Sequence, residues 1–223
     1  VSPLIEMWGF GASGVRAVPP SDSLVAETLE KVGLLNLRLD GDSLFKLNTE
    51  VELDFNAIAK GWGVDQVSCF LEKESIVNFM VEIGGEVRCS GSNAGNPWKI
   101  GISHPEHQEN YKDVIEVISL NNQSIATSGD YRNYFEYKGR KFSHTINPKT
   151  GFPVDHSLTS VTIIAPNCTL ADGLATAAMA LGLDAGIDLV EWYENTEGLL
   201  MELKKNKIIY HKTSNFDKFI LNL

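Results

Sequence analysis

Residues 158–182, "LTSVTIIAPNCTLADGLATAAMALG", decide the fold, because they place a strand directly before a helix. The segment 158–165 is rich in β-branched and apolar side chains, which favours a buried strand. The segment 169–182 carries apolar side chains at helical spacing and ends at Gly182, where a helix can stop. We therefore expect a sheet with helices packed against it.

Outward from this unit, segments of strand character outnumber segments of helix character. We expect hairpins at 35–48, 134–146 and 198–211, strands at 78–91 (broken at Gly84 and Gly85), 98–104 and 113–120, and helices at 23–33, 56–74 and 183–194. Residues 1–23 are rich in glycine and proline and are expected to form a loop. Hairpin connections predict an α+β fold with mixed, largely antiparallel sheets and packed helices, arranged as two intimate subdomains.

The composition limits the kinds of ligand. The 223-residue chain has a net charge of -10, which argues against nucleic acid as a partner because phosphate contacts need a basic surface. An anionic ligand would then need a local lysine or a bound cation. The cysteines Cys69, Cys89 and Cys168 are scattered without metal-binding spacing.

The segment "MWGFGASG" (7–14) contains a literal G-x-G-x-x-G at Gly9, Gly11 and Gly14. A dinucleotide-binding turn needs a strand before the pattern and a helix that opens within it. Two consecutive prolines follow at 19–20, and proline lacks the backbone donor that a continuing helix uses. We interpret the segment as a glycine-rich loop and reject the Rossmann hypothesis.

The helix at 169–182 carries two oxygen side chains on one face. Asp172 and Thr176 are four residues apart, so their oxygens lie one above the other. A carboxylate, a hydroxyl and nearby carbonyls suit Mg²⁺ better than Zn²⁺. Thr169 and Asp172 also match a capping box, so spacing alone leaves both interpretations open.

Other polar segments have two interpretations each. Asp54 and Lys60 in "DFNAIAKGWG" could be a helix cap and a solvated charge, or Lys60 could meet a phosphate. The segment 124–134, "SIATSGDYRNY", could form an anion-binding nest or a polar turn. His144 could be a general base at neutral pH or an ordinary exposed histidine.

Six segments in order resemble the flavin transferases of the ApbE family. They run from Pro3 to about Gly182 and read "PLIEMWGFG", "DFNAIAKGWGVDQV", "VEIGGEVRCSG", "IATSGDYRNYF", "HTINPKTGFPV" and "ADGLATAAMALG". In this resemblance Gly9 and Gly11 belong to a family segment, and Gly14 completes the dinucleotide pattern by accident.

The resemblance implies a reaction. Members of the family bind FAD, use Mg²⁺ to cleave its pyrophosphate, and attach FMN by a phosphoester to a threonine or serine of an acceptor protein while AMP leaves. Some relatives mainly hydrolyse FAD to FMN and AMP. Two alternatives to the transferase therefore stay open, an FAD pyrophosphatase and a non-catalytic FAD-binding protein.

The resemblance also implies roles for individual residues. The metal ligands would be the side chains of Asp172 and Thr176 and the backbone oxygens of Ala57 and Ala175. The FAD contacts would be Asp54, Lys60, Ile146 and Thr127. His144 would activate the acceptor hydroxyl.

The resemblance finally implies where the protein acts. Residues 1–223 would be one ApbE-like flavin transferase domain that lacks the family's N-terminal segment, which contributes to the flavin pocket. That segment often begins with an exported, lipid-anchored cysteine. We therefore expect an exported lipoprotein of the periplasm or cell envelope, held at the membrane only through an anchor outside this chain.

Overall fold

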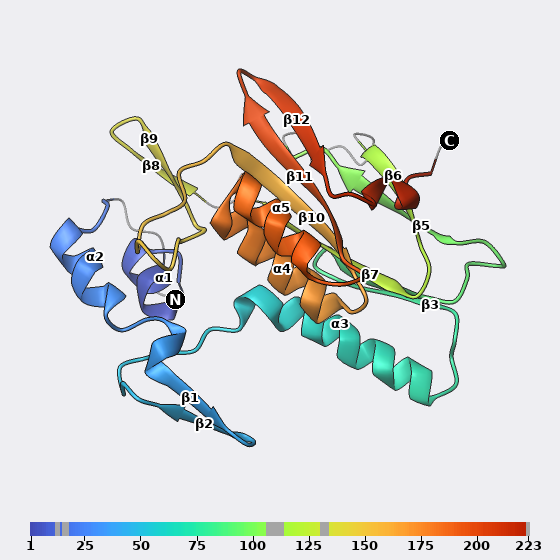
Figure 1. Cartoon of the computed structure of the whole chain (residues 1–223), viewed down its shortest axis with the longest axis horizontal. Coiled ribbons are helices and arrows are strands. Elements are labelled where there is room, and N and C mark those ends of the chain that lie inside the picture. The colour runs from blue at the N-terminus through green and yellow to red at the C-terminus, as the bar shows by residue number, and fades with distance from the viewer. Residues whose placement is uncertain (12–13, 15–17, 106–113, 130–133, 222–223) are drawn as a thin grey trace. The chain divides into compact units, whose positions relative to one another are not determined.

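The computed structural model describes residues 1–11, 14, 18–105, 114–129 and 134–221. The chain forms two compact units (Figure 1), which confirms the expected two subdomains. One consists of Val1–Phe55 and Asp130–His156 and is here named the small unit. The other consists of Asn56–Gly129 and Ser157–Leu223 and is named the sheet unit.

The sheet unit contains a six-stranded sheet in the order β12-β11-β10-β7-β4-β3. Every pairing in it is antiparallel, as expected. The strands are β3 (Phe79–Ile83), β4 (Glu86–Ser90), β7 (Gln123–Gly129), β10 (Leu158–Ala165), β11 (Glu197–Lys204) and β12 (Lys207–Lys212). The position of β10 inside the sheet explains why nearly all of its residues are buried, because both of its faces are covered.

The two faces of β10 belong to two different cores. Val161 and Ile163 pack with helices α4 (Cys168–Leu181) and α5 (Leu183–Trp192). Ile164, which points to the opposite face, packs with the hairpin of β5 (Trp98–Ser103) and β6 (Val114–Leu120) and with the 3-10 helix η2 (Phe216–Phe219). Each fully buried side chain of this kind contributes about 1.5–3 kcal/mol. Helix α3 (Asn56–Lys73) lies beside α4 (Figure 1).

The small unit is built around aromatic side chains. Its elements are α1 (Ser2–Trp8), α2 (Asp22–Leu29), the 3-10 helix η1 (Leu34–Asn36), and the hairpins β1–β2 (Leu37–Asp40, Ser43–Lys46) and β8–β9 (Tyr134–Tyr137, Arg140–Ser143). Trp8 is buried and lies 5.6 Å from the ring of Phe142. Its indole Nε1 donates to the carbonyl oxygen of Gly151 at 2.8 Å.

The expectation of a loop over residues 1–23 is wrong for its first part, because Ser2–Trp8 form helix α1. Pro3 lies in the first turn, where a backbone donor has no helical partner and proline is tolerated. The helix ends at Gly9, whose φ of 84° gives a left-handed cap. Gly9 therefore follows a helix and not a strand, which confirms that the glycine pattern is no Rossmann turn. Helix α2 is capped by Ser21, two residues before the expected start.

The interpretation of residues 124–134 as a polar turn or nest is also wrong over its first half. Strand β7 includes these residues up to Gly129, and Ser124, Ile125 and Ala126 are buried in the sheet. Small side chains here allow helix α4 to pack closely on the strand. Residues 130–133 lie outside the described part of the chain.

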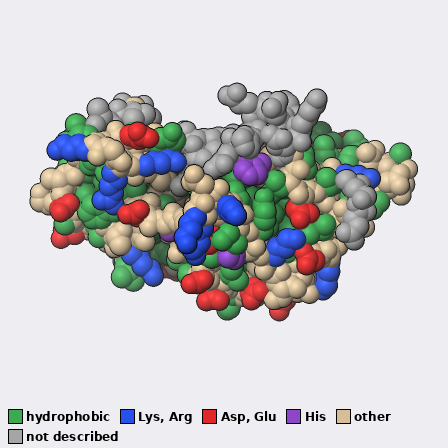
Figure 2. All heavy atoms as spheres, turned by 90° about the horizontal axis from the view of Figure 1, so that it is seen from above, with side chains coloured by type: hydrophobic (Ala, Val, Ile, Leu, Met, Phe, Trp, Pro, Cys, Tyr) green, Lys and Arg blue, Asp and Glu red, His purple; other side chains and the backbone are tan. Residues whose placement is uncertain are grey.

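The surface charge is mixed. On the face drawn in Figure 2, acidic and basic side chains alternate, and neither sign forms a continuous patch. None of the helices in the described ranges has the length and hydropathy needed to span a bilayer.

Candidate functional site

The crossing of α3 and α4 leaves no room for a side chain at Gly61. A Cβ atom there would lie 2.3 Å from the carbonyl oxygen of Cys168 and 2.9 Å from the Cβ of Asp172. The backbone N–H of Gly61 donates to Oδ2 of Asp172 at 2.9 Å. In a regular α-helix this N–H would donate to the carbonyl of Ala57, so the bond places the carboxylate beside the Ala57–Gly61 turn.

Asp65 fixes the start of α4 against α3. Its carboxylate accepts the first two backbone N–H groups of α4, each at 2.8 Å, and the hydroxyl of Thr169 at 2.6 Å. Asn167 caps the helix in the ordinary way. The capping-box alternative for Thr169 and Asp172 is therefore wrong, and the carboxylate of Asp172 faces α3.

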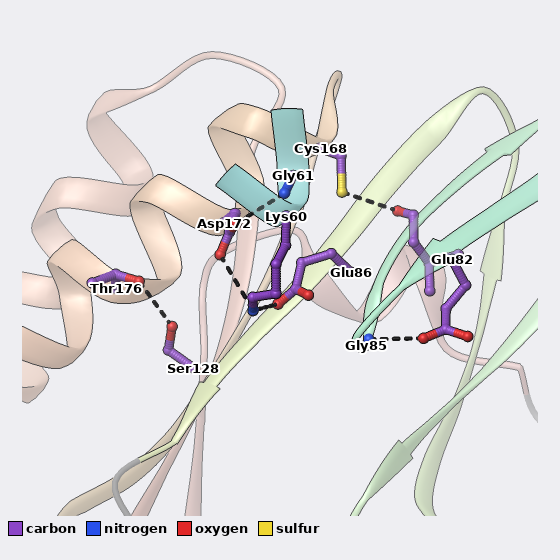
Figure 3. Close-up of polar contacts among 10 residues, drawn as sticks. Lys60, Gly61, Glu82, Gly85, Glu86, Ser128, Cys168, Asp172 and Thr176 are labelled. Carbon is purple, nitrogen blue, oxygen red and sulfur yellow. Dashed lines mark hydrogen bonds and ion pairs between the residues drawn. The ribbon is translucent and has the colours of Figure 1, made fainter. Parts of the chain in front are cut away.

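Lys60 and two buried carboxylates form a charged cluster, here named the Lys60 cluster (Figure 3). The Nζ of Lys60 lies 2.5 Å from Oε1 of Glu86, the first residue of β4, and 4.0 Å from Oδ1 of Asp172. The side chains of Glu86 and Asp172 are 2% and 4% exposed, whereas that of Lys60 is 45% exposed. The interpretation of Lys60 as an isolated solvated charge is therefore wrong.

The cluster holds more negative than positive charge. Burial raises the pKa of Asp172, although the hydrogen bond from Gly61 and the charge of Lys60 oppose that rise. Burial likewise raises the pKa of Glu86, against the hydrogen bond and charge of Lys60. Oε2 of Glu86 has no hydrogen-bond partner among the described residues. Two buried carboxylates thus share one ammonium, an arrangement that a further cation would stabilise.

Thr176 and Thr127 lie on different faces of β7. The hydroxyl of Thr176 lies 3.1 Å from that of Ser128. The hydroxyl of Thr127 lies 2.9 Å from that of Thr162. Because neighbouring strand residues point to opposite faces, Thr127 faces away from α4 and from Thr176.

The remaining predicted residues belong to the small unit. Ile146 is buried and pairs with Pro153 through an isolated backbone bridge. The ring of His144 lies 6.3 Å from that of Phe10, edge to face. Asp54 lies in the segment that leads into α3. The roles of these three residues stay predictions.

The donor set expected for a metal is of an unusual kind. In the described part of the chain, no group of three or more His, Cys, Asp or Glu side chains could hold a metal ion. The predicted set instead combines one carboxylate and one hydroxyl with the backbone oxygens of Ala57 and Ala175. The structure places Ala57 in the first turn of α3 and Ala175 between Asp172 and Thr176 on α4.

Sequence reasoning missed three residues of this region, Asp65, Glu86 and Ser128. Glu86 is 26 residues from Lys60, so no local spacing joins them. The sequence feature that could have indicated Glu86 is the Gly84-Gly85 turn, because the chain reverses there and the next strand, β4, begins with this glutamate. A glutamate that begins an otherwise buried strand needs a partner, and Lys60 supplies it.

Known proteins match most of this chain. The family model described as "ApbE family" matches residues 1–200. A FAD:protein FMN transferase of Vibrio cholerae is 43% identical over 86% of this chain and 57% of its own length. One of Haemophilus influenzae is 40% identical over 98% of this chain and 64% of its own length. The chain thus spans about three fifths of the length of these curated relatives.

Solved structures agree with the sequence matches. The flavin transferase ApbE of Vibrio cholerae has a TM-score of 0.84 and 36% identity, covering 97% of this chain and 68% of that one. The apo form of the Pseudomonas stutzeri flavinyl transferase ApbE has a TM-score of 0.85 and 36% identity, covering 98% of this chain and 67% of that one. The α+β class expected from the hairpins is therefore also the class of these neighbours.

Proposed function

Because this chain belongs to the ApbE family, we propose that the protein transfers FMN from FAD to a threonine or serine hydroxyl of an acceptor protein and releases AMP. One observation supports this most directly. The buried carboxylate of Asp172 is held by the backbone of Gly61 and faces the ammonium of Lys60. A protein with a net charge of -10 needs a local positive charge to accept a diphosphate, and Lys60 together with a cation at Asp172 would supply it.

The Asp172 region fits a hard divalent cation. Among the described residues, the contact of Oδ1 of Asp172 is with the ammonium of Lys60 at 4.0 Å, and the cluster carries one more negative than positive charge. We assign Mg²⁺ to the side chains of Asp172 and Thr176 and to the backbone oxygens of Ala57 and Ala175. When bound, Mg²⁺ would neutralise charge on the pyrophosphate and make AMP a better leaving group.

The chain's own residues would bind and orient the substrates. Lys60, half exposed at the edge of the cluster, would donate to the diphosphate of FAD, and Asp54 and Ile146 would contact the rest of the molecule. The position of Thr127 on the sheet face away from α4 does not support its inclusion in the same pocket.

The transfer is a substitution at phosphorus. The acceptor oxygen forms a bond to the phosphorus of the FMN half, and the bond from that phosphorus to the bridging oxygen breaks, so AMP leaves with the electron pair. The hydroxyl proton would pass to His144, the candidate general base.

The test mixes the full-length protein with FAD, Mg²⁺ and a candidate acceptor that contains threonine. Intact mass spectrometry follows the acceptor and chromatography follows AMP. We expect a mass gain of one FMN with matching AMP, and a loss of about 100-fold or more in Asp172→Asn. Asp188→Asn, which removes an exposed carboxylate from α5, is the matched control.

Other results of this experiment would indicate a different function. Free FMN and AMP with an unmodified acceptor would indicate hydrolysis. Intact FAD would indicate a binding protein without this activity. Full activity in Asp172→Asn would refute the assignment of the metal to Asp172.

A further inference from the structure

Glu86 has no role in the proposed reaction, but its buried and incompletely hydrogen-bonded carboxylate suggests a function. Its side chain is 2% exposed at the start of β4. Oε1 accepts from Lys60, whereas Oε2 is buried without a partner among the described residues. A buried carboxylate oxygen without a hydrogen bond is costly, by roughly 1–3 kcal/mol or more.

Asp65, on α3, is an example of a carboxylate with a purely structural role in this region. Both of its oxygens accept hydrogen bonds, three in total, and all three donors belong to the first two residues of α4. Glu86 uses one oxygen only, and its partner Lys60 is 45% exposed. Its second oxygen, Oε2, is buried and lacks a donor among the described residues, so a donor that the protein alone does not supply would stabilise it.

The place of the Glu86 side chain beside the cation site follows from its contact with Lys60. Figure 3 shows the side chain of Glu86 reaching toward Lys60, whose ammonium also faces Asp172. The site assigned above to a cation is therefore next to the same ammonium that Glu86 holds. A hydrated cation brings O–H donors, because Mg²⁺ usually keeps several of its waters in protein sites.

We propose that Glu86 is a positioning residue of the cation site. Through Oε1 it holds the ammonium of Lys60 at 2.5 Å and away from Asp172, and through Oε2 it accepts a hydrogen bond from a water of the bound cation. This inference rests on the proposed function, because it takes Asp172 as the seat of the metal.

The charges of the cluster support this role. Lys60, Glu86 and Asp172 together carry one net negative charge, and a divalent cation would change it to one net positive charge, suited to a phosphate. Without the charge of Glu86, the ammonium of Lys60 would be attracted to Asp172 alone and would compete there with the cation.

The experiment measures Mn²⁺ binding to the full-length protein without FAD, by electron paramagnetic resonance of the free ion. We expect Glu86→Gln to weaken binding by about 10- to 100-fold, as changes to groups around metal ligands commonly do. Glu82→Gln is the matched control, because Glu82 belongs to the same hairpin but is exposed and, within the described ranges, accepts its hydrogen bond from the backbone N–H of Gly85 in the turn. It should bind like the wild type.

A double variant separates the two parts of the role. Adding Lys60→Met to Glu86→Gln removes the competing ammonium, so we expect part of the lost affinity to return. If Glu86→Gln fails to fold, Glu86→Asp keeps the charge but withdraws it from Lys60, and an intermediate affinity is expected. Thermal unfolding of each variant shows that it is folded.

Wild-type affinity, within twofold, in Glu86→Gln or in its aspartate substitute would overturn the proposal, and so would absence of Mn²⁺ binding in the wild type. A double variant as weak as the single one would overturn the part played by Lys60. Asp172→Asn reports on the proposed function separately: if it still binds Mn²⁺, the metal is seated elsewhere.

Discussion

Replacing Gly61 by alanine tests the contact between α3 and α4. The added Cβ would lie 2.3 Å from the carbonyl oxygen of Cys168, and ordinary contact begins at 3.4 Å, so the helices would have to separate by about 1 Å. Overpacking of this kind costs roughly 1–3 kcal/mol. Loss of the hydrogen bond to Asp172 costs about 1.5–3 kcal/mol more, because its acceptor is charged.

One effect opposes these costs. Alanine is favoured over glycine inside a helix by about 1 kcal/mol, so we expect Gly61→Ala to lower the free energy of unfolding by about 1.5–5 kcal/mol. With a urea slope of about 3 kcal/mol/M, the midpoint would fall by roughly 0.5–1.7 M. Urea unfolding followed by circular dichroism measures it, and the same variant should bind Mn²⁺ more weakly than the wild type.

Gly63→Ala is the control on the same helix. A Cβ at Gly63 would meet only the end of the Ile83 side chain, at 3.4 Å. This variant should be as stable as the wild type or gain up to about 1 kcal/mol. The reasoning would be refuted if Gly61→Ala were as stable as Gly63→Ala.

Three further predictions concern other parts of the chain. Trp8→Phe leaves the carbonyl of Gly151 without its indole donor, so urea unfolding should show a loss of about 1–3 kcal/mol. In the native protein at pH 8, of the three cysteines only Cys69 should react with a thiol reagent, because Cys89 and Cys168 are buried and burial raises the pKa of Cys89 to about 11. All three thiols should react in denaturant, and reaction of all three in the native state would contradict the buried positions. Hydrogen bonds from the Ser157 hydroxyl and from His211 lower the pKa of Glu202 below its usual 4.5, so the ionised carboxylate stabilises the fold above pH 4.5 and this stabilisation is lost as the pH falls through the lowered pKa. The free energies of unfolding of Glu202→Gln and the wild type should therefore converge as the pH falls below 4.5, and a difference that stays constant with pH would contradict the prediction.

The sequence predicted the elements whose periodicity is set by burial. The helix at 169–182 and the strand at 158–165 have clear patterns because α4 buries one face and β10 buries both. Helix α1 was missed because Pro3 was interpreted as a sign of a loop, although a proline in the first turn breaks no helical hydrogen bond.

Strand β7 was missed for a different reason. Most of its side chains are small because α4 packs closely on it, so Ile125 and Thr127 are its only β-branched residues and it has none of the aromatic residues from which strands are recognised. Glu86 and Asp65 could not be found from spacing, since their partners are 26 and more than 100 residues away in the chain. Such pairs are created by tertiary packing and leave no local pattern.

The small unit is built from two segments that are far apart in the sequence, and this has a consequence for its folding during translation. Trp8 leaves the ribosome long before Gly151, whose carbonyl its indole binds across 143 residues of chain. At a translation rate of about 5–20 residues per second, the wait is roughly 7–30 s. During that time the apolar face of α1 lacks its aromatic partners from β8 and β9, so this face is exposed on the nascent chain, where chaperones can bind it. A slower translation rate or a chaperone deficit should therefore lower the yield of this protein before it affects proteins whose cores are contiguous in sequence.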